Sequence, residues 1–360
     1  MGRLTIPLIL LLLAPAVSAA EYRDAMGRTL SLDRTPRRII ALGPGAMRLV
    51  AYLGAADMVV ATENIEIKYP KGRPYTVANH ERLMALPVIS EGGPDKVPDY
   101  EKIIAAAPDL IIACSVDGQL LQAVESKTRI KVFSADYGSL GAFDGEKFKR
   151  VLSTLGDILG KKERAAYLVK RVDFYSQDLH RRAAAAKNRP SVYVGGLGFK
   201  GAQGLTSTQY AYEPFSLLGI RNVIDGGARR PMHIFIDQET LLKADPEVIF
   251  MDAGGLRVFS DDQPTHGSFY PLLRAFRNRA VYTTLPYNYY TTNVEIVFIN
   301  AYFIGRVLYP KEFADVEIES KARKMLKEFV GKDVYDEFMD EKHFYKRMRI
   351  DGGIAFESMP

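Results

Sequence analysis

The feature that most constrains this 360-residue chain is a unit that occurs twice. Residues 99–112 read DYEKIIAAAPDLII, and residues 237–250, placed 138 positions later, read DQETLLKADPEVIF without a gap. Each copy predicts a short helix, a proline-containing turn and a buried strand. Asp99 and Asp237 suit the N-caps of the two helices, and an acidic residue in the first turn suits the positive end of a helix.

The neighbours of the two copies also match. A Leu-Gly pair typical of a helix end precedes each copy, at 53–54 and 218–219, and a further apolar strand follows each, at 130–133 and 280–283. Helices that alternate with apolar strands favour parallel sheets covered by helices. We therefore expect an α/β protein with two related Rossmann-like lobes, whose sheets are mainly parallel.

A segment with few helix breakers separates the two lobes. Residues 145–188 have helical periodicity, and 161–187 are long enough for one helix of about 40 Å. A flexible hinge would be rich in Gly, Ser or Pro, so we expect a long rigid bridging helix. The predicted division is an N-terminal lobe at 21–144, the bridging helix at 145–188, and a C-terminal lobe with a helical tail at 189–360. Helices are expected at 293–309, 311–330 and 333–339, and the basic tail from Glu341 is expected to be solvated.

Residues 1–20 have the pattern of a secretory signal peptide. Arg3 precedes an apolar run, and the small residues 17–20 allow cleavage after Ala19 or Ala20. The run is shorter than the about 20 residues that a membrane-spanning helix needs. Because no cysteine follows the cleavage region, we expect no lipid anchor, and the mature protein is expected to be soluble and periplasmic.

Composition excludes several classes of protein. A single cysteine, Cys114, excludes a disulfide scaffold and a cysteine-built metal cluster, and it ends an apolar strand as a buried structural thiol would. The net charge of +5 is spread along the chain, which argues against nucleic-acid binding. The sequence shows neither a nucleophile–base pair nor a cluster of His and carboxylates, so we expect no catalytic residues. A secreted enzyme on the same scaffold remains the less favoured alternative.

Four features together resemble one protein family. They are DAMGR at 24–28, RIIALGP at 38–44, the doubled unit at Glu101 and Glu239, and the helical bridge. The chain resembles the periplasmic solute-binding proteins of the helical-backbone class, which serve ABC importers of ferric siderophores, haem and cobalamin. The resemblance implies a ligand cleft between the lobes, a monomer without a cofactor, and an ABC permease/ATPase complex of the inner membrane as partner.

The resemblance also assigns roles to the two glutamates. It implies that Glu101 and Glu239 dock with arginines of the permease, as a two-point electrostatic contact. The alternative is that each is an ordinary first-turn acid that the helix dipole stabilises.

Ligands of two-lobed α/β proteins bind where the carboxyl ends of the strands face one another. The loops there offer the following candidates: Pro44 and Glu63 in the first lobe, and Tyr210, Tyr212, His233, Tyr287, Asn288, Tyr289 and Tyr290 in the second. Tyrosines supply an apolar face and a hydroxyl, which suits a bulky chelate. The alternative for individual tyrosines is packing beneath the loops.

The expected ligand is an iron(III)-siderophore or a similar metal chelate such as haem or cobalamin. A free metal ion or an oxyanion is the alternative within the binding class. Direct ligation of iron by Tyr289 and Tyr290 is disfavoured, because successive residues of a strand point to opposite faces. Arginines bind anionic chelates in a bidentate manner; the candidates are Arg73, Arg229, Arg230 and Arg257.

Overall fold

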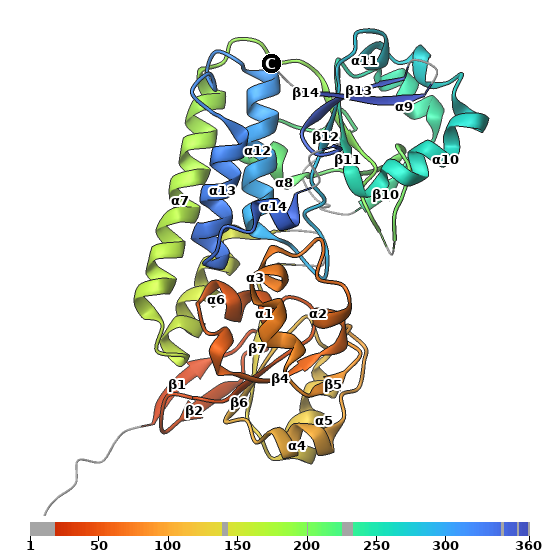
Figure 1. Cartoon of the computed structure of the whole chain (residues 1–360). Coiled ribbons are helices and arrows are strands. Elements are labelled where there is room, and N and C mark those ends of the chain that lie inside the picture. Colours follow the sequence, from red (N-terminus) through yellow and green to blue (C-terminus); the bar gives the residue numbers. More distant parts are fainter. Residues whose placement is uncertain are drawn as a thin grey trace, which may run out of the picture.

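The computed structural model describes residues 19–138, 143–199, 201–224, 233–339, 342–350 and 353–358, so most of the predicted signal peptide lies outside it. The first lobe is built on a five-stranded parallel sheet with the strand order β5-β4-β3-β6-β7 (Figure 1). Its strands are β3 (Ile39–Leu42), β4 (Val59–Glu63), β5 (Val88–Ser90), β6 (Leu110–Cys114) and β7 (Val132–Ala135). Strands β3, β6 and β7 are buried along their whole length, as expected for a sheet with helices on both faces.

The second lobe contains a five-stranded mixed sheet with the order β14-β13-β12-β11-β8. Its parallel part consists of β8 (Val192–Gly195), β11 (Val248–Asp252) and β12 (Val281–Thr284). The antiparallel hairpin of β13 (Lys346–Ile350) and β14 (Ile354–Ser358) completes the sheet. The expectation of a helical, solvated C-terminal tail is therefore wrong for these residues, because Met348 is buried in the core of the second lobe.

The duplication predicted from the sequence is present in the topology. The order β3-β6-β7 in the first lobe corresponds to β8-β11-β12 in the second. The helices α4 (Tyr100–Ala106) and α9 (Gln238–Ala244) precede β6 and β11. The side chain of Asp99 accepts a hydrogen bond from the Lys102 N–H, and Asp237 accepts one from Thr240. Both helices end in the left-handed conformation at matched positions.

The lobes differ at one edge of their sheets, which lies beyond β3 in the first lobe and beyond β8 in the second. In the first lobe this edge carries β4 and β5, whereas in the second lobe it is reduced to a single parallel bridge between Val192 and Asn222. The second sheet grows instead on the opposite side, through the C-terminal hairpin. The two lobes are thus related in their central strands but not in their edges.

A layer of helices joins the lobes (Figure 1). It contains α6 (Gly145–Ile158), α7 (Lys162–Ala185), α12 (Val294–Leu308) and α13 (Ile318–Val330). The predicted bridging segment 145–188 is thus two helices that pack on each other, and its long member α7 has 24 residues, or about 36 Å. Helix α12 packs on both α7 and α13, so the lobes are connected by a bundle of helices rather than by the single bridging helix that the sequence predicts. One hydrophobic core runs from α1 (Ala46–Tyr52) through these helices into β8 and β11.

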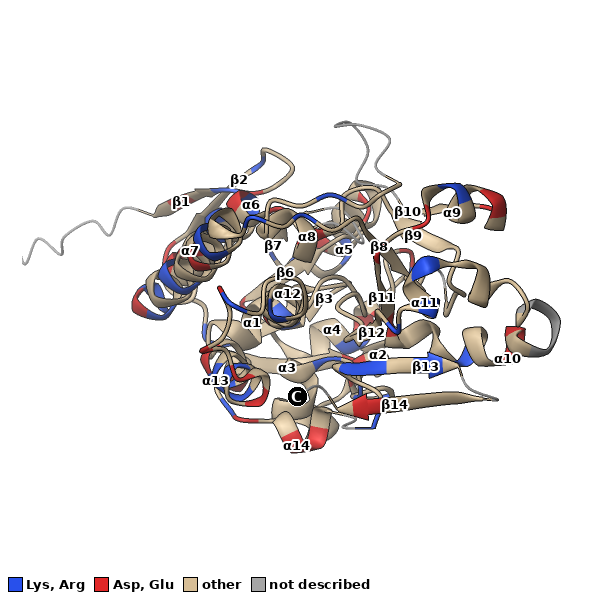
Figure 2. Cartoon of the chain, turned by 90° about the horizontal axis from the view of Figure 1, so that it is seen from above, with Lys and Arg blue, Asp and Glu red and all other residues tan. Residues whose placement is uncertain are grey.

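The remaining elements complete the lobes and their connections. They are β1 (Ala20–Arg23), β2 (Thr29–Leu32), α1 (Ala46–Tyr52), η1 (Ala56–Met58), α2 (Asn64–Lys68), α3 (Pro74–Met84), α5 (Gly118–Thr128), β9 (Ser207–Gln209), α8 (Glu213–Leu217), β10 (His233–Phe235), η2 (Ala253–Gly255), α10 (Leu256–His266), η3 (Tyr270–Leu272), α11 (Arg274–Arg277) and α14 (Tyr335–Phe338). Figure 2 shows acidic and basic residues interspersed over most of these elements. Among the described helices, none combines the length and the apolar character that crossing a membrane requires.

Candidate ligand cleft and docking helices

The connection between β12 and α12 leaves the second lobe and lies against the first. Its residues Tyr290 and Thr291 have φ values of +54° and +71°, a conformation that L-residues rarely adopt. The buried Arg48 of α1 holds this turn in place. Its guanidinium donates hydrogen bonds to the carbonyl oxygens of Tyr289 and Tyr290, at 2.9 and 3.1 Å. The turn is therefore fixed by a residue of the opposite lobe.

Two further side chains secure the same contact. Asn293 accepts a hydrogen bond from Arg48 at 3.1 Å and donates one to the carbonyl oxygen of Gly72 at 2.9 Å. Arg48 also donates to the hydroxyl of Tyr137 at 2.8 Å. The lobes are thus joined along a polar contact near the end of β7 and the start of α1.

Glu63, predicted as a ligand contact, lies at this interlobe contact. It is only 2% exposed at the end of β4. Its Oε2 accepts hydrogen bonds from the backbone N–H of Gly43, at 3.0 Å, and from the hydroxyl of Tyr290, at 2.9 Å. Burial, followed by the nearby Glu66, raises the pKa of Glu63 to about 8. The neighbouring Pro44 is also buried.

A buried ion pair lies beside Glu63. Arg73 and Glu66 are joined at 3.1 Å, and Glu66 also accepts from the hydroxyls of Tyr75 and Thr76. The Arg73 guanidinium lies 5.1 Å from the ring centre of Tyr289. Arg73 is fully buried, so its charge is committed to this network and not presented to an anionic ligand. Of the other predicted arginines, Arg229 and Arg230 lie outside the described residues.

The remaining arginine candidate is on the surface. The side chain of Arg257 is 82% exposed and lies 3.8 Å from Asp261 on the same helix, α10. An exposed pair of this kind is weak. Arg257 therefore keeps a charge that is available to solvent, unlike Arg73.

Two of the predicted tyrosines lie beneath the surface of the second lobe. Tyr212 and Tyr287 are each 1% exposed, and their ring centres are 5.6 Å apart. The hydroxyl of Tyr287 donates to Oε2 of Glu213 at 2.5 Å, and the backbone N–H of Phe143 donates to the other oxygen at 3.1 Å. Burial raises the pKa of Glu213 to about 7. A direct ligand contact by either tyrosine would require this packing to open.

An exposed aromatic group lies on β10 and the loop after β8. The ring of Phe199 stacks on His233, with centres 4.6 Å apart, and Phe235 meets His233 edge-on at 4.8 Å. Ser207 holds His233 through a 2.6 Å hydrogen bond, and burial lowers the pKa of the imidazole. Figure 1 shows β10 on the part of the second lobe that faces the first. His233 was predicted as a ligand contact, whereas Phe199 and Phe235 were not, although Phe199 follows a Gly-rich strand end.

The other predicted cleft residues are partly accessible. Tyr210 and Asn288 are half-buried, and Asn288 accepts a hydrogen bond from the Thr292 hydroxyl at 2.9 Å. Tyr289 is 38% exposed. Among the predicted tyrosines, Tyr210 and Tyr289 are therefore at least partly accessible to solvent.

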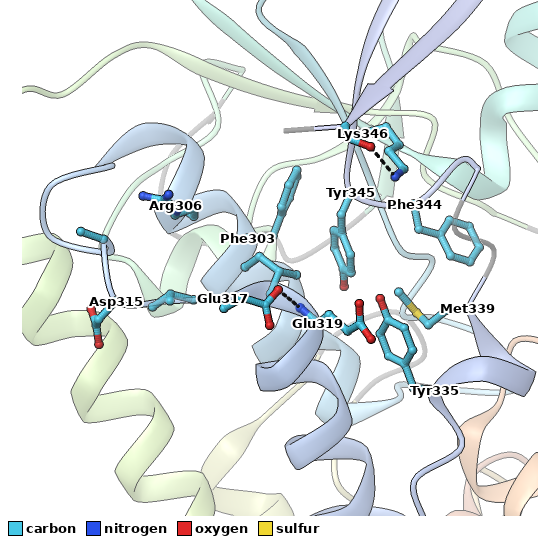
Figure 3. Close-up of a pocket in the computed structure, with 14 residues that line it drawn as sticks. Phe303, Arg306, Asp315, Glu317, Glu319, Tyr335, Met339, Phe344, Tyr345 and Lys346 are labelled. Atoms are coloured by element: carbon cyan, nitrogen blue, oxygen red, sulfur yellow. Dashed lines mark hydrogen bonds between the residues drawn. The ribbon is translucent and has the colours of Figure 1, made fainter. Parts of the chain in front are cut away.

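Two hollows lie outside this contact. One of about 610 Å³ lies between the end of β7, the start of α6 and α8. The other, of about 520 Å³, lies between α12, α13, α14 and β13 (Figure 3). The hydroxyl of Tyr345, which is labelled in Figure 3, donates to Oδ1 of Asn300 at 2.9 Å. The side chain of Glu317, on the same wall, caps α13 through the N–H groups of Glu319 and Ser320.

No group of three or more His, Cys, Asp and Glu among the described residues could hold a metal ion. Cys114 is buried, and burial raises the pKa of its thiol to about 12, so it lacks the thiolate character of a nucleophile. This agrees with the expectation of a structural thiol.

Glu101 and Glu239 occupy the same place on the two duplicated helices. Both are exposed in the first turn, two residues after the capping aspartate. Glu239 forms an ion pair with Lys243 at 3.0 Å. The matched position in the first lobe is Ala105, and Glu101 has no ion-pair partner among the described residues. Both carboxylates are accessible to a partner.

The family model for periplasmic binding proteins matches residues 39–286, which is more than half of the chain. The chain belongs to the periplasmic binding protein family. The members of this family are the solute-binding proteins of ABC transporters. These binding proteins take part in transport and are not enzymes, and they work outside the cytoplasm. A comparison with curated protein sequences finds no match.

Solved structures share the fold. An ABC transporter solute-binding protein of Sulfurospirillum deleyianum has a TM-score of 0.64 at 21% identity and covers 88% of this chain and 97% of its own. The periplasmic protein MolA of Haemophilus influenzae, bound to molybdate, has a TM-score of 0.67 at 16% identity, with coverage of 87% and 98%. An ABC-type Fe3+-hydroxamate transport protein of Saccharomonospora viridis has a TM-score of 0.52 at 22% identity, with coverage of 81% and 99%. The two-lobed fold is thus confirmed, and it is a fold on which different ligands occur.

Proposed function

We propose that this protein binds a metal chelate, of the ferric siderophore, haem or cobalamin kind, between its lobes and delivers it to an ABC permease. The observation that carries the choice of ligand is the exposed group of Phe199, His233 and Phe235. Phe199 is 46% and Phe235 59% exposed. An exposed surface made of aromatic rings suits a ligand that has its own apolar face. A bare ion would gain nothing from it.

The alternative ligand, an oxyanion, is motivated by the similarity to the molybdate-bound MolA. An oxyanion needs several hydrogen-bond donors that have no other partner. The two arginines at the interlobe contact, Arg48 and Arg73, are already committed to carbonyl groups, a tyrosine and a carboxylate. This favours the chelate over the oxyanion.

Delivery follows the two-point arrangement of the exposed carboxylates. Glu101 and Glu239 lie on equivalent helices of different lobes, so a partner with two arginines contacts both lobes at once. Residues 1–20 are proposed to direct export, after which the protein works in the periplasm as an unanchored monomer. The helical bundle between the lobes limits the change on binding to a small rocking motion.

Ligand binding is tested by titration of the purified protein. The chain contains no tryptophan, so its intrinsic fluorescence comes from tyrosine, and coloured chelates quench it. The probes are haemin, ferric desferrioxamine, cyanocobalamin, sodium molybdate and nickel chloride, with calorimetry as the second measurement. We expect one of the three chelates to bind and molybdate and nickel to leave the signal unchanged. Binding of molybdate or nickel without binding of any chelate would overturn the proposal.

The aromatic group is tested in the same titration. Phe235→Ala removes one exposed ring, and we expect it to weaken binding of the chelate about ten-fold. Leu272→Ala serves as the control, because Leu272 is similarly exposed at 53% but lies on η3. Equal affinity of the Phe235→Ala variant and the wild type would show that this group is not the ligand surface.

A further inference from the structure

We propose that each docking glutamate belongs to a contact patch that also contains an exposed aliphatic side chain, and that these side chains enter apolar recesses beside the arginines of the ABC permease. The inference rests on the proposed docking role of Glu101 and Glu239. It adds the second half of the contact and specifies the surface of the partner: two equivalent sites, each with a cation and an apolar recess.

The first observation is a matched pair of exposed apolar residues. Ile104 lies three residues after Glu101 on α4, and Leu242 lies three residues after Glu239 on α9. Ile104 is 51% and Leu242 38% exposed. Residues three apart on a helix are neighbours on its surface, so each aliphatic side chain lies beside its carboxylate.

The buried faces of α4 and α9 show that the folding of these helices onto their lobes does not require an apolar side chain at Ile104 or Leu242. Ile103 and Leu241 occupy the preceding position, and each is fully buried. The apolar contact of α4 and of α9 with its lobe is thus made by that residue. A polar residue at the next position would satisfy the fold equally well, yet both helices carry an aliphatic one.

A single exposed apolar side chain needs no explanation. Here, an exposed aliphatic residue occurs at the same position of both copies of a duplicated unit, beside the same glutamate, which points to a surface used twice.

The chemistry of the two parts is complementary. An exposed ion pair contributes little affinity in salt, but it guides association and fixes orientation. Burial of an aliphatic side chain supplies affinity that does not depend on salt. A patch with both parts explains how two exposed carboxylates are sufficient for orientation, while the aliphatic residues retain the complex.

The experiment measures docking of the full mature chain to its permease–ATPase complex in lipid nanodiscs, by biolayer interferometry at low salt and at about 0.5 M NaCl. Ile104→Ser and Leu242→Ser are each expected to weaken docking about ten-fold at both salt concentrations. Glu101→Gln and Glu239→Gln are expected to weaken it at low salt and to lose most of that effect at high salt. The matched control is Leu272→Ser, an equally exposed apolar residue outside the duplicated unit, which is expected to leave docking unchanged.

The outcomes separate the two proposals. If the glutamate variants dock like the wild type at low salt, the docking role of Glu101 and Glu239 is wrong, and the proposed contact patch is wrong as well. If the glutamate variants are impaired but Ile104→Ser and Leu242→Ser dock like the wild type, only the apolar half of the patch is overturned. Docking is also measured for Ile104→Ala and Leu242→Ala, which retain helix propensity, and unchanged thermal unfolding of the Ser and Ala variants ensures that a loss of docking is not a loss of structure.

Discussion

The buried carboxyl of Glu63 allows a quantitative prediction about the interlobe contact. Its pKa rises from an ordinary value of 4.5 to about 8, chiefly because of burial. Below pH 4.5 Glu63 is protonated in the folded and the unfolded protein. Between pH 4.5 and 8 the unfolded chain releases this proton and the folded protein keeps it, so the contribution of Glu63 to stability falls as the pH rises. Above pH 8 the loss is complete.

The size of the effect follows from the shift. The pKa rises by about 3.5 units, and each unit corresponds to about 1.4 kcal/mol, which gives a loss on the order of 5 kcal/mol. Glu63→Gln imitates the protonated form. Its amide oxygen accepts the hydrogen bonds from Gly43 and Tyr290 in place of Oε2, and it cannot ionise.

The assay is urea unfolding of the wild type and of Glu63→Gln at several pH values from about 5 to 8.5, followed by tyrosine fluorescence and far-UV circular dichroism. Glu213 and Asp252, whose pKa values are each raised to about 7, also titrate in this range. They are present in both proteins, so their effects cancel in the difference. We expect the stability of Glu63→Gln relative to the wild type to increase by about 3–5 kcal/mol from pH 5 to pH 8.5.

A difference between the two proteins that does not change with pH would refute this reasoning, because it would mean that Glu63 is already ionised in the folded protein at pH 5. Leu272→Ala is the control. Its exposed side chain lies on η3 and carries no titratable group, so its substitution is expected to leave the pH profile of stability unchanged.

Three further predictions concern other contacts. Arg48→Met leaves two carbonyl oxygens without a donor, at about 1–3 kcal/mol each, and we expect a loss of about 2–6 kcal/mol in urea unfolding; stability equal to that of the wild type would contradict this role of Arg48. Gly45→Ala introduces a Cβ 2.4 Å from the Tyr137 hydroxyl at a φ of +93°, and its melting temperature should fall well below that of Gly54→Ala, whose new Cβ meets nothing within 4 Å; equal melting temperatures would contradict the geometry. Lys243→Ala frees Glu239 from its ion pair and makes the second patch resemble the first, so docking to the permease should tighten about two-fold at low salt; unchanged docking would mean that the pair does not compete with the partner.

The sequence predicted the parts of the fold that depend on local patterns. The capping aspartates, the proline turns and the buried strands of the duplicated unit all form as expected, because caps and apolar runs act over a few residues. The long helix at 161–187 is present as α7, with bounds that differ by one or two residues. The hairpin β13–β14 was missed, because the basic residues on both sides of the buried Met348 hide it in the sequence.

The interlobe contact could not be derived from the sequence. Arg48 is fully buried and contacts residues more than 240 positions away, and no local pattern distinguishes it from a surface arginine. The tandem Tyr289-Tyr290 was recognised, but its role depends on the left-handed turn at Tyr290 and Thr291, which the first lobe stabilises. The predicted ligand contacts at Tyr210, His233, Asn288 and Tyr289 stay predictions.

The return of the chain to the first lobe has a consequence for how this protein is made. The side chain of Tyr52 in α1 contacts Glu295, and Lys332 donates a hydrogen bond to the carbonyl oxygen of Ala78 at 2.7 Å. Arg164 joins the carbonyl oxygen of Tyr52 to the end of α13. The contacts of α12, α13 and Lys332 with the N-terminal lobe therefore form only after these segments have been synthesised, whereas many N-terminal domains fold as units during synthesis. Shortened products that end before α13 would expose the apolar surface that α13 covers and would be prone to proteolysis.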